Sequence, residues 1–227
     1  MKITIVYQDE ALVVIEKPAG VPSCVLRQAQ DDRLSVEEWL QKKIPGAKLV
    51  HRLDNNTSGL LAAAKTEKAF AKLRAIWKSP EVVKKYTALV LGRTPPSGTI
   101  SIPIAHHARK KKKMVTGGKK AREAYTEFKT IRHFPPAGGH GKNYSLLEVK
   151  IQTGVRHQIR IHLASIGHPI AGDPLYQKTK FREQDILKLP RHFLHLSYLQ
   201  FPHPLTGKMF ECKSELPQDL KGVLETL

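Results

Sequence analysis

HRLDNNTSGLL, at residues 51–61, packs a base, an acid, hydroxyls, amides and a glycine between two apolar runs. Asn55 and Asn56 tolerate left-handed backbone, and Gly59 permits it, so the stretch predicts a tight loop. Residues 48–50 and 59–64 read as a strand pair on either side of it. The loop would therefore present Asp54 at the end of a strand. The alternative is an Asx turn in which this carboxylate only accepts backbone hydrogen bonds, and composition favours neither.

Outward from this loop, short β-branched runs alternate with fewer helical patterns. Strands are predicted at residues 3–7, 11–16, 82–91, 122–131, 144–152, 192–201 and 208–213. Ser35 and Glu38 form a capping box for a helix over 36–44, and Thr66 caps a helix over 67–78. Pro217 opens a short helix at 217–227. Because strands dominate, we expect one α+β domain over residues 1–227, with a largely antiparallel mixed β-sheet flanked by helices and loops.

A second dense constellation is TGVRHQIRIHL at residues 153–163. Alternation permits a strand, but Val155, Ile159, Leu163 and Ile166 form an apolar stripe of helical spacing, and Gly167 is a natural helix end. The spacing favours a helix that sets Arg156 and Arg160 one turn apart. An arginine at the edge of the apolar face can pair with a carboxylate, whereas the simpler reading is a basic solvent face.

The net charge of +18, from 38 Lys and Arg against 20 Asp and Glu, favours a polyanionic partner such as nucleic acid. The alternative is that the lysines only keep the protein in solution. The run ARKKKKMVTGGKKAR at 108–122 is rich in bases and contains no acid. We expect a solvated loop there whose Lys110, Lys111, Lys112 and Lys113 grip phosphates without reading sequence.

Other features exclude several classes of protein. No apolar run is long enough to span a membrane, and the N-terminus does not read as a signal peptide. The cysteines, Cys24 and Cys212, fit a reducing cytoplasm and form no disulfide framework or CxxC pair. The spacing of His157 with His162, and of His192 with His195, does not suit a metal site.

Four motifs in order resemble the RluA-type pseudouridine synthases over nearly the whole chain. HRLDNNTSGLL at 51–61 is similar to the signature HRLDxxTSG, and KKYTALVLG at 84–92 to the second motif. GVRHQIRIHLASIGHPIAGDPLY at 154–176 and HFLHLSYLQFPHPLTGK at 192–208 resemble the third and the closing motif. The opening VYQDEALVVIEKPAGVPS resembles the usual start of the family.

Two departures from the family pattern stand out. Val155 holds the place directly after Thr-Gly where the family often has arginine, so the role of Arg156, which follows it, is not transferred. The catalytic pattern also begins near residue 3, so we expect the chain to lack the N-terminal S4-like RNA-binding domain of many relatives.

The resemblance implies a pseudouridine synthase catalytic fold that isomerises uridine in RNA without a cofactor or metal. The N-glycosidic bond breaks, the uracil rotates, and C5 bonds to C1′. Asp54 is implied as the carboxylate that either attacks C1′ or takes a proton from C2′. Arg160 is expected to supply the cation that keeps Asp54 ionised. Tyr86 is implied as the active-site tyrosine, whose ring can stack on the uracil.

The target base must leave its stack before a carboxylate can reach its sugar. The resemblance implies that Arg52 fills the vacated place, assisted by His51; a phosphate contact or an internal ion pair are the alternatives for Arg52. Thr57 and Arg156 are further candidates for contact with the substrate. We expect ribosomal and/or transfer RNA as partner, neither DNA nor a membrane, and a cytoplasmic monomer.

Rival interpretations remain at this stage. Charge alone favours a non-catalytic RNA-binding or ribosome-associated protein, although a simple binder needs no acid such as Asp54. A metal-dependent nuclease that uses histidines and Asp54 is a second rival. An RNA chaperone role alongside catalysis is a third.

Overall fold

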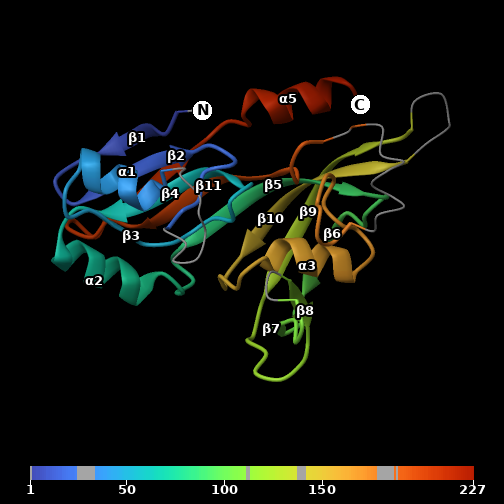
Figure 1. The fold of residues 1–227 in the computed structure, drawn as a ribbon, viewed down its shortest axis with the longest axis horizontal. Coiled ribbons are helices and arrows are strands. Elements are labelled where there is room, and N and C mark those ends of the chain that lie inside the picture. The colour runs from blue at the N-terminus through green and yellow to red at the C-terminus, as the bar shows by residue number, and fades with distance from the viewer. Residues whose placement is uncertain (1, 25–33, 111–112, 137–141, 178–186, 188) are drawn as a thin grey trace. The chain divides into compact units, whose positions relative to one another are not determined.

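The computed structural model describes residues 2–24, 34–110, 113–136, 142–177, 187 and 189–227 (Figure 1). It confirms the expected α+β class. The chain forms two compact units, one of Met1–Val83 with Leu196–Glu215 and one of Lys84–His195 with Leu216–Leu227. Because each unit combines two separate stretches of chain, this division leaves the prediction of a single catalytic domain untested.

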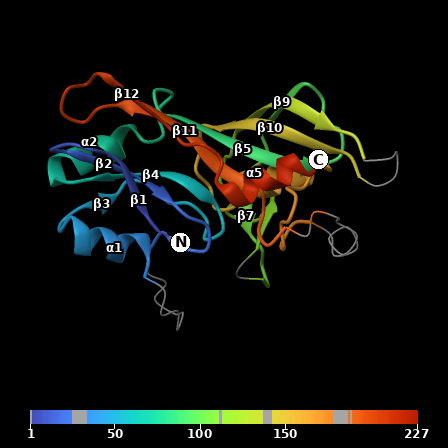
Figure 2. The ribbon, with the colours of Figure 1, turned by 90° about the horizontal axis from the view of Figure 1, so that it is seen from above.

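The first unit is built on a sheet in the order β1–β2–β4–β11, with β3 paired to β4 and β12 to β11. The pairs β1–β2, β2–β4, β3–β4 and β11–β12 are antiparallel, and Figure 2 shows β11 and β12 as a long hairpin. The elements are β1 (Thr4–Gln8), β2 (Leu12–Lys17), α1 (Val36–Lys43), β3 (Lys48–Leu49), β4 (Ser58–Ala64), α2 (Glu67–Ile76), β11 (Leu194–Pro202) and β12 (Met209–Lys213).

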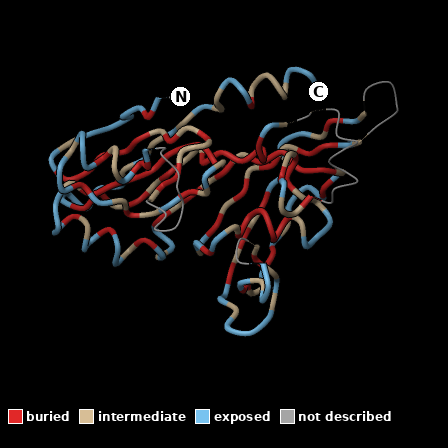
Figure 3. Tube along the Cα trace, in the orientation of Figure 1, coloured by how far each residue is buried: buried red, intermediate tan, exposed pale blue. Residues whose placement is uncertain are grey.

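The core of the first unit lies along β2 and β4. Every residue of β4 is buried, and so are Leu12 to Ile15 of β2, which explains why both strands read as continuous apolar runs (Figure 3). Both helices begin at the caps that the sequence predicts. The Ser35 side chain and Glu38 form a reciprocal capping box on α1, and Thr66 accepts from the backbone of α2.

Gly59 explains how β4 lies close to β11. Its φ of +121° is a conformation that other residues rarely adopt, and an added Cβ would lie 2.4 Å from the carbonyl oxygen of Leu196. A side chain at this position would therefore meet backbone rather than a movable neighbour.

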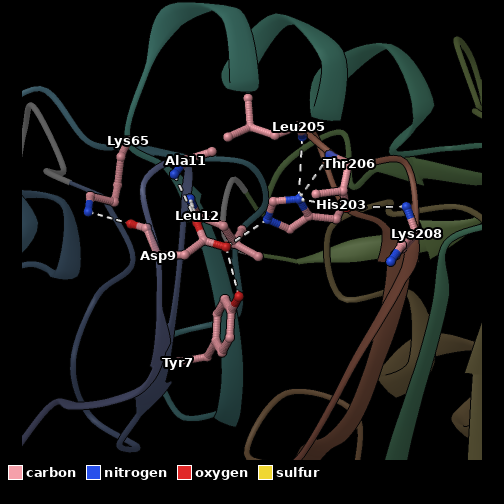
Figure 4. Close-up of polar contacts among 9 residues, drawn as sticks. All are labelled: Tyr7, Asp9, Ala11, Leu12, Lys65, His203, Leu205, Thr206 and Lys208. Carbon is pink, nitrogen blue, oxygen red and sulfur yellow. Dashed lines mark hydrogen bonds and ion pairs between the residues drawn. The ribbon is translucent and has the colours of Figure 1, made fainter.

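Asp9 and His203 join two turns of the first unit (Figure 4). Asp9 Oδ1 accepts from the backbone N–H groups of Ala11 and Leu12, each at 2.8 Å, and Oδ2 accepts from Tyr7 Oη at 2.7 Å. His203 Nε2 lies 2.7 Å from the same Oδ2 atom. Burial raises the pKa of Asp9, but these hydrogen bonds outweigh it and hold that pKa at about 2.

The second unit contains the sheet β5–β10–β9–β6, whose neighbours pair antiparallel, and a separate antiparallel hairpin of β7 and β8. Predicted strands 122–131 and 144–152 correspond to β9 and β10. The elements are β5 (Val83–Leu91), β6 (Ser97–Ile100), β7 (Ile104–His106), β8 (Met114–Thr116), β9 (Thr126–Phe134), β10 (Tyr144–Ile151), α3 (Gln158–Ser165) and α5 (Gln218–Glu225).

The basic run at 108–122 is not the continuous loop that the sequence predicts, because Met114–Thr116 pairs with Ile104–His106 as β8. Met114 is 2% exposed and joins a small core with residues of β7 and α3, which anchors the hairpin. Figure 1 shows the hairpin projecting beside α3, away from β9 and β10.

The C-terminal helix α5 belongs to the second unit and follows the predicted position, with Pro217 at its N-cap rather than inside its first turn. A bidentate ion pair anchors α5: Arg191 Nε lies 2.7 Å, and Nη2 3.1 Å, from the two carboxylate oxygens of Asp219. Within the described ranges, no helix has the length and apolarity needed to cross a bilayer.

Candidate active site

The loop of residues 50–57 in the first unit carries Asp54 between β3 and β4, as predicted. Its turn is closed by the Thr57 N–H, which donates to the Asp54 carbonyl at 3.1 Å. Asp54 is partly exposed, whereas Thr57 is buried. Among the described non-glycine residues only Lys120 and His157 have positive φ, so the loop turns without left-handed asparagines.

Residues 17–23 clamp this loop on both sides of Asp54. Leu53 N–H donates to Ser23 Oγ at 3.1 Å, and the same hydroxyl donates to the Leu53 carbonyl at 2.8 Å. After Asp54, the Asn55 carbonyl accepts from Gly20 N at 2.9 Å and from Lys17 Nζ at 2.8 Å. The backbone that presents the carboxylate is therefore fixed before and after it.

Lys17 is a site-building residue that the sequence interpretation missed. It is 0% exposed, and its ammonium also donates to the carbonyls of Pro18 at 2.9 Å and Val21 at 2.7 Å. Three carbonyls thus surround a buried cation that would otherwise be costly. The available signal was a lysine at the end of an apolar strand, directly before a Pro-Ala-Gly break.

His51 and Arg52 precede the loop turn. His51 Nε2 accepts the Ala62 N–H at 3.1 Å, and its ring stacks on Trp77 with centroids 4.8 Å apart. Arg52 is exposed. Burial and the nearby Glu37 raise the pKa of the Cys24 thiol, while Arg52 lowers it. The Arg52 guanidinium therefore lies near Cys24, and its predicted role at a flipped base stays a prediction.

Tyr86 and Arg160 belong to the second unit. Tyr86 lies in β5 opposite Val149 of β10 and is 6% exposed. Lys84, two residues earlier, shares its strand face and is 4% exposed, and burial lowers the pKa of Lys84 to about 8. A lysine on an alternating strand gave no signal that it would point inward.

Arg160 pairs with a carboxylate of its own unit that the sequence did not single out. Its Nε lies 2.6 Å from Asp173 Oδ2 and its Nη2 2.9 Å from Oδ1. Asp173 is 0% exposed and also accepts from Leu175 N at 2.8 Å and Tyr176 N at 3.2 Å. Burial raises the pKa of Asp173, but the hydrogen bonds and charge of Arg160 hold it below its usual value.

Two polar residues of α3 fix the direction in which Arg160 points. Gln158 Nε2 donates to Thr126 Oγ1 at 3.0 Å, and its Oε1 accepts the Val155 N–H at 3.0 Å. One turn later, His162 Nδ1 lies 2.9 Å from the same hydroxyl, and its Nε2 lies 2.8 Å from the Ile102 carbonyl. Burial lowers the pKa of His162. The helix is thus tied to β9 by one threonine, with Arg160 held toward Asp173.

The predicted helix at 155–166 is confirmed, but the predicted spacing of its arginines is wrong. α3 begins at Gln158, so Arg156 precedes the helix and lies exposed in a turn. The cause is His157, whose φ of +56° ends the turn and starts the helix. Ile166, which the apolar stripe included, is 38% exposed.

The hairpin of β7 and β8, here called the basic hairpin, has Lys110 and Lys113 between its two strands. The other two predicted lysines, Lys111 and Lys112, lie outside the described residues. Lys110 is exposed, and Lys113 is half-buried. His107 Nδ1 accepts from Arg109 N and Lys110 N, each at 3.1 Å, and this shapes the start of the turn. Within the described part of the chain, no three His, Cys, Asp or Glu side chains gather as a metal site would require.

A family model described as RNA pseudouridylate synthase matches residues 11–165. The chain belongs to this family. It is 36% identical over 243 residues to ribosomal large subunit pseudouridine synthase D of Pseudomonas aeruginosa, covering all of this chain and 72% of that protein. It is 41% identical over 181 residues to an uncharacterized RNA pseudouridine synthase of Chloroflexus aurantiacus, covering 79% of this chain and 53% of that protein.

A solved structure of the human RNA pseudouridylate synthase domain containing 1 protein shares the fold. Its TM-score is 0.78 at 26% identity, covering 98% of this chain and 87% of that one. The predicted family, fold class and enzyme class are thereby confirmed. The chain is an RNA pseudouridine synthase, an isomerase.

Proposed function

We propose that this synthase isomerises uridine in ribosomal RNA and that Asp54 is its reacting carboxylate. The observation that carries this assignment is the double clamp on the loop, which fixes the backbone on both sides of Asp54 and leaves its side chain partly exposed. A reacting group needs such a fixed geometry, because misplacement by about 1 Å can cost about a hundredfold in rate.

The reaction needs only this chain's own groups and the uridine. Asp54 either attacks C1′ or removes the C2′ proton, the N-glycosidic bond breaks, and the freed uracil rotates. C5 then bonds to C1′ as the ester bond to Asp54 breaks or, in the other route, as C2′ regains its proton. C5 gives up its proton and N1 is protonated, so the product is an isomer of the starting uridine. We assign to Arg160 the role of the cation that serves Asp54. We assign to Tyr86 the role of contacting the uracil ring. The pair with Asp173 fixes the position of the Arg160 guanidinium.

We assign to Arg52 the role of filling the space that the flipped base leaves, because its exposed side chain lies in the same loop as Asp54. His51 supports it by anchoring the start of that loop through Ala62 and Trp77. Thr57, whose N–H closes the turn, is proposed as a further contact with the substrate.

The basic hairpin and Arg156 are proposed to hold the RNA backbone. Lys110 and Arg156 are exposed, as phosphate-binding side chains must be, and Lys111 and Lys112 are proposed to extend this grip. Ribosomal RNA is proposed because several relatives are named as ribosomal large subunit synthases, and transfer RNA remains the second substrate class. We further propose a cytoplasmic monomer with one catalytic domain that does not act on DNA or at a membrane.

Pseudouridine mapping of total RNA from a deletion strain tests the function, and complementation tests the residue. We expect one or more uridines to lose modification and wild-type enzyme to restore them. Asp54→Asn should abolish restoration while RNA binding and melting temperature persist. Glu10→Gln, the same chemical change at an exposed residue outside the loop, should restore fully. Substantial turnover by purified Asp54→Asn enzyme would contradict the assignment.

A further inference from the structure

Tyr176 contacts three parts of the second unit at once. It lies in the turn after α3, where its N–H donates to Asp173 at 3.2 Å. Its hydroxyl lies 2.9 Å from the Met114 N–H of β8 and 3.0 Å from His157 Nδ1. One half-buried tyrosine therefore joins the hairpin, the start of α3 and the carboxylate that holds Arg160.

The ring of Tyr176 also lies against two cations. The Arg160 guanidinium carbon is 5.3 Å and the Lys113 ammonium 5.7 Å from the ring centroid, both within the range of cation–π attraction. Arg160 belongs to the proposed catalytic group, and Lys113 belongs to the basic hairpin. The two charges, far apart in sequence, thus share one aromatic contact.

The hydrogen bonds of the hydroxyl fix the ring that contacts both cations. The hydroxyl accepts the Met114 N–H and shares a second hydrogen bond with His157 Nδ1. A change in the position of β8 therefore moves the hydroxyl. Because the ring is rigid, its contact with the Arg160 guanidinium moves as well.

We propose that Tyr176 is a positioning residue that couples RNA binding at the basic hairpin to the orientation of the Arg160–Asp173 pair. This proposal rests on the proposed function, in which the hairpin holds RNA and Arg160 serves the reaction. When phosphates engage the hairpin, Met114 and Lys113 set the position of the ring. A shift of the ring on RNA binding then adjusts the orientation of the guanidinium, which is already paired with Asp173.

Two substitutions separate the hydroxyl from the ring. Tyr176→Phe removes the contacts with Met114 and His157 but keeps the ring, so KM should rise about threefold to tenfold with kcat little changed. Tyr176→Leu removes the ring as well, so kcat should also fall about tenfold or more. The probe is an in vitro transcript of large-subunit ribosomal RNA. Tyr198→Phe, which loses only a hydroxyl bonded to Gln200 and Glu211, is the control and should leave both constants unchanged.

If the role of Tyr176 were merely structural, both variants would lower the melting temperature, but they would not differ in their effects on KM and kcat. A folded Tyr176→Leu enzyme with wild-type KM and kcat overturns the proposal. If Tyr176→Leu does not fold, Tyr176→Phe decides alone, because a wild-type KM in that variant also overturns it.

A second readout does not depend on activity. The Nε–H resonance of Arg160 reports its pairing with Asp173. Lys113→Met should shift this resonance in the wild-type background and leave it in place in Tyr176→Leu, which lacks the ring that both cations contact. If the wild-type chain formed no pseudouridine, the proposed function would fail while this measurement still decided the coupling. If Lys113→Met leaves the Arg160 resonance unshifted in the wild-type background, the proposed coupling is refuted.

Discussion

Asp173→Asn removes the negative charge that faces the Arg160 guanidinium inside the second unit. The two side chains are 5% and 0% exposed, so water cannot replace the lost partner. Breaking a buried ion pair in this way costs about 3–5 kcal/mol, because the remaining charge is left uncompensated. Asparagine retains one oxygen for the N–H groups of Leu175 and Tyr176, so we expect about 3 kcal/mol.

Urea denaturation at pH 7 measures this loss as a lower midpoint at an unchanged slope. A fall of about 6–12 °C in Tm should accompany it for a protein of this size. Glu148→Gln is the matched control, because Glu148 and Lys85 form a surface pair 44% and 36% exposed. That substitution should cost less than about 1 kcal/mol.

The pH dependence provides a further test of the same pair. The folded pKa of Asp173 lies below its unfolded value of about 3.9. Its stabilising contribution is therefore complete above the unfolded pKa and is lost as the pH falls through the folded pKa. The difference between wild type and Asp173→Asn should shrink in acid. A variant within about 1 kcal/mol of wild type at pH 7 would refute the reasoning.

Three other changes have defined outcomes. Gly59→Ala places a Cβ 2.4 Å from the Leu196 carbonyl oxygen at a φ of +121°, so stability measured in urea should fall by at least about 3 kcal/mol. Asp9→Asn should cost about 2 kcal/mol at pH 7, because the pKa of Asp9 is held at about 2. Since that contribution is present above the unfolded pKa and fades as the pH falls toward 2, thermal melts of variant and wild type should converge in acid. Neutralising Lys110 and Lys113 together should weaken binding to the ribosomal transcript and lower the slope of log K against log salt by about 2. The effect on kcat should be smaller. An unchanged slope would mean that neither lysine contacts a phosphate.

Local signals in the sequence predicted the elements well. The capping box of Ser35 and Glu38 spans three residues, so both partners are visible together, and α1 begins where the box predicts. The same holds for Thr66 at the start of α2. The loop that carries Asp54 was likewise predictable, because a polar stretch stands between two apolar runs, although the loop turns without left-handed asparagines.

The residues that hold the site in place were not predictable, because each acts through a contact with a residue far away in the sequence. Lys17 meets the Asn55 carbonyl across 38 positions, and Tyr176 meets Met114 across 62. No periodicity or cap marks such pairs in a single sequence. The start of α3 was misplaced for a related reason: the left-handed His157 follows from the bonds that hold Gln158 and Tyr176 around it.

The position of β11 has a consequence for how the enzyme is made. Leu196 approaches Gly59 in the first unit, yet the ribosome synthesises it long after β4. During translation β4, every residue of which is buried in the folded chain, therefore lacks its later neighbour until Leu196–Glu215 is synthesised. Nascent chains stalled before that segment should be protease-sensitive and bound by chaperones, and the first unit should become resistant only after Leu196–Glu215 has been synthesised.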